Sequence, residues 1–245
     1  STLSTPKVNI ATIEDPVEYR MARVNQTQVS PRIGLTFATG LRALLRQDPN
    51  IIMVGEIRDE ETAQIATNAA LTGHLVLSTL HTNDAVTALP RLMEMSVPTF
   101  LIASTTNLVM AQRLVRKICS QCIESYTLTK KQLTDLGRQI DVPTILATLV
   151  KYEAISPHQS VNEILFFRGR GCTRCNHEGY RGRIGIYESF EVTPPVADLI
   201  REKAPLTKLR DAALAQGMIP MIQDGFLKAK AGITTLEEIL RVTKE

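Results

Sequence analysis

The sequence is poor in aromatic residues. It contains no tryptophan, and aromatic residues make up only 4% of its 245 residues. Proteins that hold single-stranded nucleic acid depend on aromatic stacking and on a basic groove that follows the phosphates. Here the net charge is only +3, and the basic residues form no stripe along the chain. The composition therefore gives little support for nucleic-acid binding.

Long apolar runs are absent as well. No segment approaches the roughly 18 consecutive apolar residues of a membrane span, and the amino terminus lacks the basic and then apolar pattern of a signal peptide. Hydrophobic residues nevertheless make up 44% of the chain, which is enough to bury one large core or two modest ones. We expect a soluble, cytoplasmic protein that can still reach a membrane through a partner.

Polar clusters follow short apolar runs in the first 85 residues. The three runs are residues 8–13, 51–54 and 75–80. They lead into Glu14, Glu56 and His81, respectively, and helical patterns separate them. Strands that are apolar on both faces are typical of a parallel sheet with helices on both sides. Ligands bind beyond the carboxyl ends of such strands, so we expect an active site at that edge.

Helix boundaries carry recognisable signals. Thr36 is a suitable N-cap for a helix that ends before Pro49. Asp59, followed by two glutamates, favours the start of the next helix, and Gly73 favours its end. Apolar residues at helical spacing predict one longer helix over residues 98–118.

All four cysteines lie in two Cys-x-x-Cys pairs, Cys119 with Cys122 and Cys172 with Cys175. This spacing lets two sulfurs of each pair converge on one metal, and zinc takes four thiolates at tetrahedral vertices. Four protein ligands leave no open position, so the zinc would be structural. A redox dithiol and two structural disulfides are the alternatives. His177 could replace a cysteine, but four thiolates are already available.

Five segments together resemble one protein family. IEDPVE at 13–18, LRALLRQDPNIIMVGEIRD at 41–59 and TGHLVLSTLHTNDA at 72–85 resemble the aspartate box, Walker B region and histidine box of the type II secretion and type IV pilus ATPases. Residues 169–188 and 232–243 resemble that family's zinc-binding and carboxyl-terminal segments. The tetracysteine module is generally missing from the retraction motors, so the resemblance favours pilus assembly or protein export.

The resemblance implies an α/β fold with a RecA-like P-loop ATPase core. Members of the family bind ATP phosphates with a P-loop, GxxxxGK[ST], just upstream of the aspartate box, and no such run occurs here. We expect the carboxyl-terminal part of a motor, beginning just after its P-loop. The expected divisions are 1–118 for the partial core, 119–180 for the tetracysteine module with a helical insert, and 181–245 for a helical region in which residues 234–238 carry a capping-box signal.

The resemblance assigns roles on the catalytic side of the site. Glu14 would orient or deprotonate the attacking water, with Glu18 as the second glutamate of the same box. Glu56 would hold the water shell of Mg²⁺. His81 and His74 would sense or contact the terminal phosphate of ATP. Without that context, a histidine at a strand end is more often merely hydrogen-bonded.

Three further residues fall on the nucleotide-binding side of the same boxes, namely Asp15, Arg58 and Asp59. Each has a plain structural alternative. Asp15 could cap the turn after its strand, and Arg58 could simply neutralise a buried Glu56. Acidic groups at a helix start complement the exposed amides there, which would account for Asp59.

The leading hypothesis is one part of a hexameric motor ATPase that uses ATP and Mg²⁺ to power type IV pilus assembly or type II secretion. Its expected partners are an inner-membrane platform protein and a cytoplasmic adaptor, which would place it peripherally at the inner membrane. One alternative is a DNA uptake or conjugation motor of the same superfamily. The other, for the isolated chain, is a catalytically inactive interaction module stapled by zinc.

Overall fold

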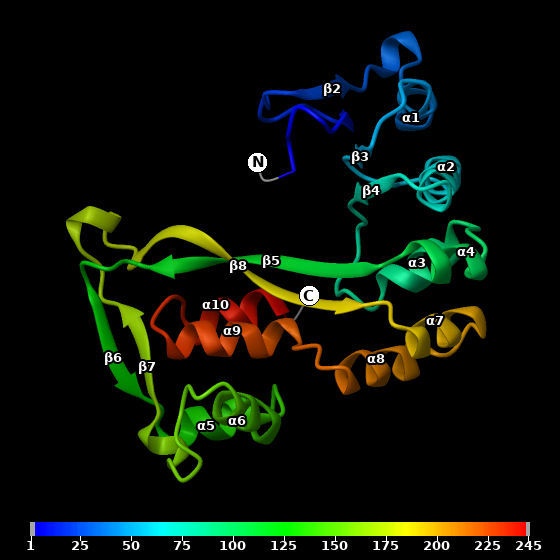
Figure 1. Cartoon of the computed structure of the whole chain (residues 1–245). Helices are drawn as coiled ribbons and strands as arrows, with labels where there is room; N and C mark the ends of the chain where they lie inside the picture. Colours follow the sequence, from blue (N-terminus) through cyan, green and yellow to red (C-terminus); the bar gives the residue numbers. More distant parts are fainter. Residues whose placement is uncertain (1–2, 244–245) are drawn as a thin grey trace. The chain divides into compact units, whose positions relative to one another are not determined.

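A computed structural model describes residues 3–243, which form two compact units (Figure 1). The first unit combines Ser1–Val109 with Phe190–Gln216, and the second combines Met110–Ser189 with Gly217–Glu245. The chain thus leaves the first unit, builds most of the second, returns, and leaves again. Among the described residues, no helix is both long enough and apolar enough to cross a membrane.

A four-stranded parallel sheet forms the centre of the first unit. Its strands are β1 (Ile10–Glu14), β2 (Val24–Gln28), β3 (Ile51–Val54) and β4 (Leu75–Ser78), in the order β2-β1-β3-β4. This confirms the α/β fold and the parallel sheet expected from the sequence. Strand β2 was not predicted, because its sequence VNQTQ is polar and lacks the apolar run of its neighbours.

Helices α1 (Phe37–Leu45) and α2 (Glu60–Leu71) contact this sheet. Gly40 of α1 lies so close to β1 that a Cβ there would collide with the Ile13 side chain. The strand side chains buried most completely are Ala11, Ile13, Ile52 and Val54. The N-caps are as predicted, since the side chain of Thr36 accepts a hydrogen bond from the first turn of α1 and that of Asp59 from the first turn of α2.

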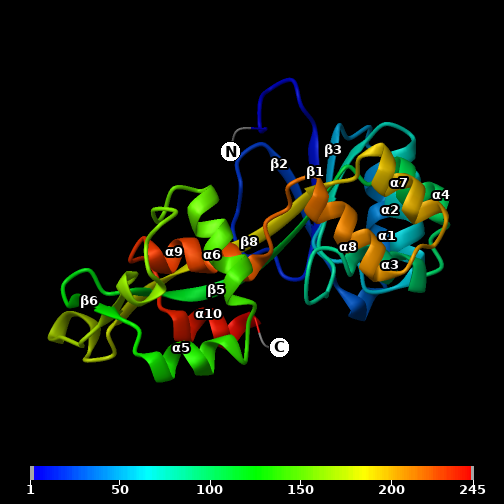
Figure 2. The ribbon, with the colours of Figure 1, turned by 90° about the horizontal axis from the view of Figure 1, so that it is seen from below.

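Four more helices complete the first unit. They are α3 (Ala88–Glu94), α4 (Thr99–Thr105), α7 (Pro194–Arg201) and α8 (Leu206–Ala215). Figure 2 shows α7 beside α4, although some 90 residues separate them along the chain. The segment Phe190–Gln216 is therefore an integral part of the unit that carries the sheet.

The single helix predicted over residues 98–118 is wrong. Helix α4 ends at Thr105, and strand β5 (Leu108–Ile118) follows, paired with β8 (Tyr180–Glu191) (Figure 1). Exposure alternates along β5, with Leu114 49% exposed and Val115 fully buried. Strand β8 likewise occupies the first part of the region for which helices were expected.

The second unit packs helices against a short antiparallel pair of strands, β6 (Ile123–Thr127) and β7 (Leu165–Gly169). Its helices are α5 (Lys130–Gly137), α6 (Val142–Lys151), α9 (Met221–Lys230) and α10 (Leu236–Thr243). Its core includes the deeply buried Leu149, Ile164, Phe166, Phe226 and Ile239. Short 3-10 turns at Pro31–Ile33, Val161–Glu163 and Thr173–Cys175 complete the elements described.

Glu238 anchors α10 through a buried carboxylate. Its side chain is only 1% exposed, and it accepts hydrogen bonds from the backbone and guanidinium of Arg116 at 2.8 and 2.7 Å. Arg241 adds two more, at 3.0 and 2.9 Å. Burial alone would raise the pKa of Glu238 above its ordinary value. The hydrogen bonds from Arg241 and Arg116 outweigh burial and bring the pKa down to about 2. One half of the predicted capping box is present, since the Thr235 hydroxyl accepts a hydrogen bond from the Glu238 backbone N–H. The Glu238 side chain accepts hydrogen bonds from Arg116 and Arg241.

Acid should therefore weaken the second unit. Because the folded-state pKa of Glu238 lies below the ordinary value of 4.5, its stabilising contribution is present above pH 4.5 and is lost as the pH falls toward 2. The shift corresponds to about 3 kcal/mol of unfolding free energy. Urea unfolding at several pH values should show Glu238→Gln destabilised near neutral pH and converging with wild type in acid. Glu237→Gln, an exposed neighbour with the same charge change, is the control; an equal loss there would contradict this role for Glu238.

Candidate functional site

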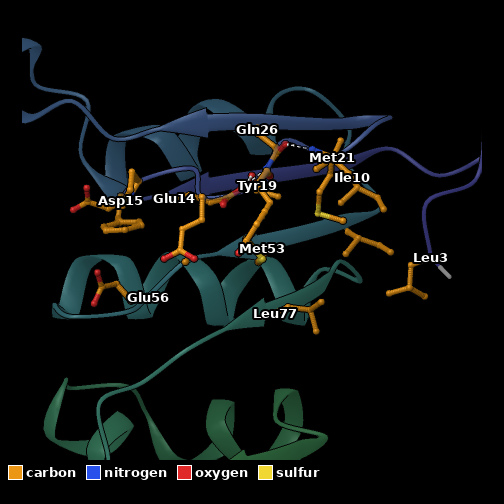
Figure 3. Close-up of a pocket in the computed structure, with 17 residues that line it drawn as sticks. Leu3, Ile10, Glu14, Asp15, Tyr19, Met21, Gln26, Met53, Glu56 and Leu77 are labelled. Atoms are coloured by element: carbon orange, nitrogen blue, oxygen red, sulfur yellow. Dashed lines mark hydrogen bonds between the residues drawn. The ribbon is translucent and has the colours of Figure 1, made fainter. Parts of the chain in front are cut away.

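A cavity of about 700 Å³ lies along one face of the parallel sheet, from the amino ends of the strands to their carboxyl ends. Glu14, Asp15 and Glu18 line it from the end of β1 and the loop that follows, and Glu56 lines it from the loop after β3 (Figure 3). The rest of the wall is largely apolar and includes Ile10, Ile51, Met53 and Leu77. Since strand side chains alternate between faces, these residues lie on the face opposite the buried Ala11 and Ile13. The site thus has an acidic end and an apolar floor.

Glu56 is the most tightly held acid of this cavity. Its side chain is 12% exposed, and its Oε2 lies 2.5 Å from Arg58 Nε and 2.7 Å from His81 Nε2. Burial raises the pKa of Glu56, but the hydrogen bonds from His81 and Arg58 outweigh burial and bring it below the ordinary value. The carboxylate is therefore charged at neutral pH. Both neighbours contact Oε2, which leaves Oε1 for a further ligand.

Backbone contacts fix the two loops that carry Glu56 and His81. Thr79 Oγ1 donates to the Gly55 carbonyl at 2.6 Å, and the Ile57 N–H donates to the Thr79 carbonyl at 3.0 Å. Farther along the second loop, Asp84 pairs with Arg210 of α8 at 2.5 Å. Thr79 and Arg210 were not anticipated from the sequence. Their roles depend on which loops become neighbours, and the sequence carries no local signal for that.

Glu14 is held through one of its two carboxylate oxygens. Oε1 accepts hydrogen bonds from Thr12 Oγ1 at 2.5 Å and from Gln26 Nε2 at 3.0 Å. Neither of these partners was anticipated, because β2 itself was not predicted. Among the residues that were predicted, the structure brings Glu14, Asp15, Glu18 and Glu56 to the cavity, and it brings Arg58 and His81 to Glu56.

Two predicted nucleotide-binding residues lie elsewhere. Asp59 caps α2, where its carboxylate accepts hydrogen bonds from the backbone and the hydroxyl of Thr62 at 2.8 and 3.1 Å. His74 lies at the amino end of β4, with Nδ1 2.9 Å from the Ala69 carbonyl. The structure does not bring either side chain to the cluster around Glu56.

The four cysteines meet in the second unit. All four are free, and their sulfurs lie within 4.8 Å of one another. The sulfur of Cys119 is 3.9 Å from that of Cys172, Cys122 is 3.8 Å from Cys175, and Cys172 is 3.7 Å from Cys175. A tetrahedron with zinc–sulfur bonds of about 2.3 Å has edges of about 3.8 Å. The donor set fits such an ion and is far too widely spaced for disulfide bonds.

The surroundings of the sulfurs also favour a bound cation. Cys175 Sγ accepts the backbone N–H groups of Cys172 and Gly179 at 3.2 and 3.3 Å. Burial alone would raise the pKa of Cys175. The hydrogen bonds outweigh burial and bring the pKa down to about 6. Burial, together with the other three sulfurs, raises the pKa of Cys122 to about 12. A cation bound among the four sulfurs would be needed to keep all of them as thiolates at these distances. The exposed His177 is not part of the cluster.

The chain is similar in sequence to ATPases of two related machines. It is 46% identical to the type II secretion system ATPase E of Vibrio cholerae over 99% of this chain and 44% of that protein. It is also 46% identical to the type IV pilus assembly ATPase PilB of Acinetobacter baylyi, over 99% of this chain and 39% of that protein. The chain therefore spans less than half the length of either relative.

A solved structure shares the fold. The crystal structure of the pilus retraction motor PilT with bound ADP superposes with a TM-score of 0.63 at 27% identity, covering 97% of this chain and 53% of that one. The family described as Type II/IV secretion system protein matches residues 1–241. The parallel sheet, the acidic cavity and the tetracysteine cluster thus belong to a chain that is a member of the Type II/IV secretion system protein family.

Proposed function

We propose that this chain forms the metal-ordering and water-orienting side of an ATP-hydrolysing motor that powers type IV pilus assembly or type II secretion. One observation carries the proposal: the ends of three parallel strands deliver Glu14, Glu56 and His81 to one edge of the sheet. Phosphoryl transfer requires little covalent chemistry from the protein, only positioned carboxylates, Mg²⁺ and cationic groups. Relatives named as ATPases of both machines add support.

The donor chemistry of the cavity suits Mg²⁺, which prefers oxygen ligands and usually keeps several waters. When bound, Mg²⁺ neutralises phosphate charge. Glu56 would hold its water shell through the oxygen that His81 and Arg58 leave uncontacted. Glu14, aided by Glu18, would orient the attacking water. His81 and Arg58, which lie beside Glu56, would supply hydrogen-bond donors to the terminal phosphate.

The assembled motor would be a hexamer, because members of this family share a site between subunits and a ring closes such contacts. An inner-membrane platform protein and an adaptor of the same machine would be its partners. Zinc at Cys119, Cys122, Cys172 and Cys175 would be structural, since four protein ligands leave no open position.

The isolated chain should hydrolyse ATP at a negligible rate. The sequence has no GxxxxGK[ST] loop, so no glycine framework directs backbone amides at the phosphates. Phosphate release with Mg-ATP should therefore stay at the level of buffer alone, whereas a full-length protein that contains this chain and a P-loop should turn over ATP. Robust Mg-dependent turnover by the isolated chain would overturn this division of the site. For the isolated chain, the lack of a P-loop favours the alternative of a catalytically inactive interaction module whose fold is held by zinc.

A further inference from the structure

The polar strand β2 places an amide on a sheet face that is otherwise mostly apolar. The register of β1 and β2 pairs Thr12 with Gln26, and Glu14 with Gln28. Because strand side chains alternate, Thr12, Glu14 and Gln26 lie on the same face. This face lines the cavity (Figure 3). Two neighbouring strands therefore present a hydroxyl and an amide to one carboxylate.

Both donors reach the same oxygen of Glu14. Thr12 Oγ1 lies 2.5 Å and Gln26 Nε2 lies 3.0 Å from Oε1. Thr12 is only 3% exposed, so water competes poorly for its hydroxyl. Hydrogen bonds to an ionised acceptor are the stronger ones. With Oε1 engaged twice, the carboxylate is fixed in rotation and Oε2 remains for another ligand.

The orientation of the Gln26 amide is itself determined. Its oxygen accepts the Met21 N–H at 2.7 Å, drawn as a dashed line in Figure 3. Only the oxygen of the amide can accept from an N–H group, so the NH₂ group must face Glu14. That NH₂ group also donates to the Tyr19 carbonyl at 3.0 Å. Gln26 therefore ties the loop between β1 and β2 to the carboxylate of Glu14.

We propose that Gln26 and Thr12 are positioning residues that hold Glu14 ready to orient the attacking water. The inference rests on the proposed role of Glu14 in ATP hydrolysis. Neither residue touches the water itself. Their hydrogen bonds occupy Oε1, so that Oε2 is the oxygen available to the attacking water. They also remove the rotational freedom that the Glu14 carboxylate would otherwise have at the end of its strand. Positioning of this kind affects the chemical step more than nucleotide binding.

The test uses the full-length ATPase. Gln26→Leu removes the amide, and Gln26→Glu keeps an acceptor for Met21 N–H but cannot donate to Glu14 when ionised. Both should lower kcat by roughly 10- to 100-fold while the affinity for ATP stays within about 3-fold of wild type. Thr12→Val should lower kcat, and Thr12→Ser, which keeps the hydroxyl, should restore it. Gln28→Leu is the control: Gln28 neighbours Glu14 in the strand register and holds the same loop by accepting from Val17 N–H, whereas the hydrogen bonds to the Glu14 carboxylate come from Thr12 and Gln26.

A double-mutant cycle separates positioning from a general effect on the fold. In a Glu14→Gln background, where the carboxylate is already gone, Gln26→Leu should cause little further loss of the residual kcat. A full additional loss, equal loss in Gln28→Leu, or unchanged kcat in Gln26→Leu would each overturn the inference. If Glu14→Gln alone retained wild-type kcat, the proposed role of Glu14 would fail first, and the inference with it.

Discussion

In a full-length protein that contains this chain and a P-loop, the proposed function predicts that Glu56→Gln reduces kcat for ATP hydrolysis by roughly 10²- to 10³-fold while largely sparing ATP binding. Glutamine keeps the shape of the side chain but removes the charge that would hold the Mg²⁺ water shell. Loss of metal-ion positioning is worth several kcal/mol in the transition state, and each 1.36 kcal/mol corresponds to tenfold in rate. Steady-state phosphate release and equilibrium binding of a fluorescent ATP analogue would measure the two effects separately.

The control for this change is Glu60→Gln. Glu60 lies at the start of α2, is exposed, and accepts a hydrogen bond from the Gln64 side chain, so it matches the charge change outside the cavity. Its kcat should remain near wild type. Normal turnover by the Glu56→Gln protein would remove Glu56 from the site. Equal loss of activity and of thermal stability would instead assign Glu56 a structural role, as the acid that accepts hydrogen bonds from Arg58 and His81.

Much of the candidate site was predictable because its residues follow the ends of parallel strands. Glu14 and Glu56 come directly after apolar runs, and the topology of a parallel sheet brings such positions to one edge. The hydrogen-bond partners of these acids were harder to predict from the sequence. Gln26 contacts Glu14 only through the register of a polar strand. His74 belongs to the same motif as His81, yet it precedes its strand rather than following it.

The fold was hardest to predict where pairing is non-local. Leu108, Val109 and Val115 fit a helical spacing, but Val109, Ala111 and Val115 also fit the covered face of a strand. The partner strand that decides between these alternatives begins only at Tyr180. The local sequence of residues 108–118 does not indicate that β8 pairs with them. By contrast, Thr36 and Asp59 were correct as N-caps because capping is settled within one turn of helix.

Removing zinc should loosen the second unit at the point where its strands turn. Cys119 follows β5, Cys122 precedes β6, and the other two cysteines lie between β7 and β8. Backbone bonds cross this junction, from Cys119 N–H to the Gly179 carbonyl at 2.9 Å and from Arg170 N–H to the Cys122 carbonyl at 3.0 Å. The strands approach so closely that a Cβ at Gly169 would collide with the backbone of Gly179.

Metal analysis of the purified chain should therefore find about one zinc per molecule. Zinc held by such sites is worth roughly 10 to 16 kcal/mol in small peptides, which matches or exceeds the net stability of most domains, roughly 5 to 15 kcal/mol. In Cys172→Ser, or after chelation, hydrogen exchange should rise over residues 119–127 and 165–180, and far less in the parallel sheet of the first unit. His177→Asn, beside the cluster but with no sulfur, should keep both the metal and the protection. Metal-free protein of unchanged stability would show that the paired strands β6–β7 and β5–β8 hold this junction without an ion.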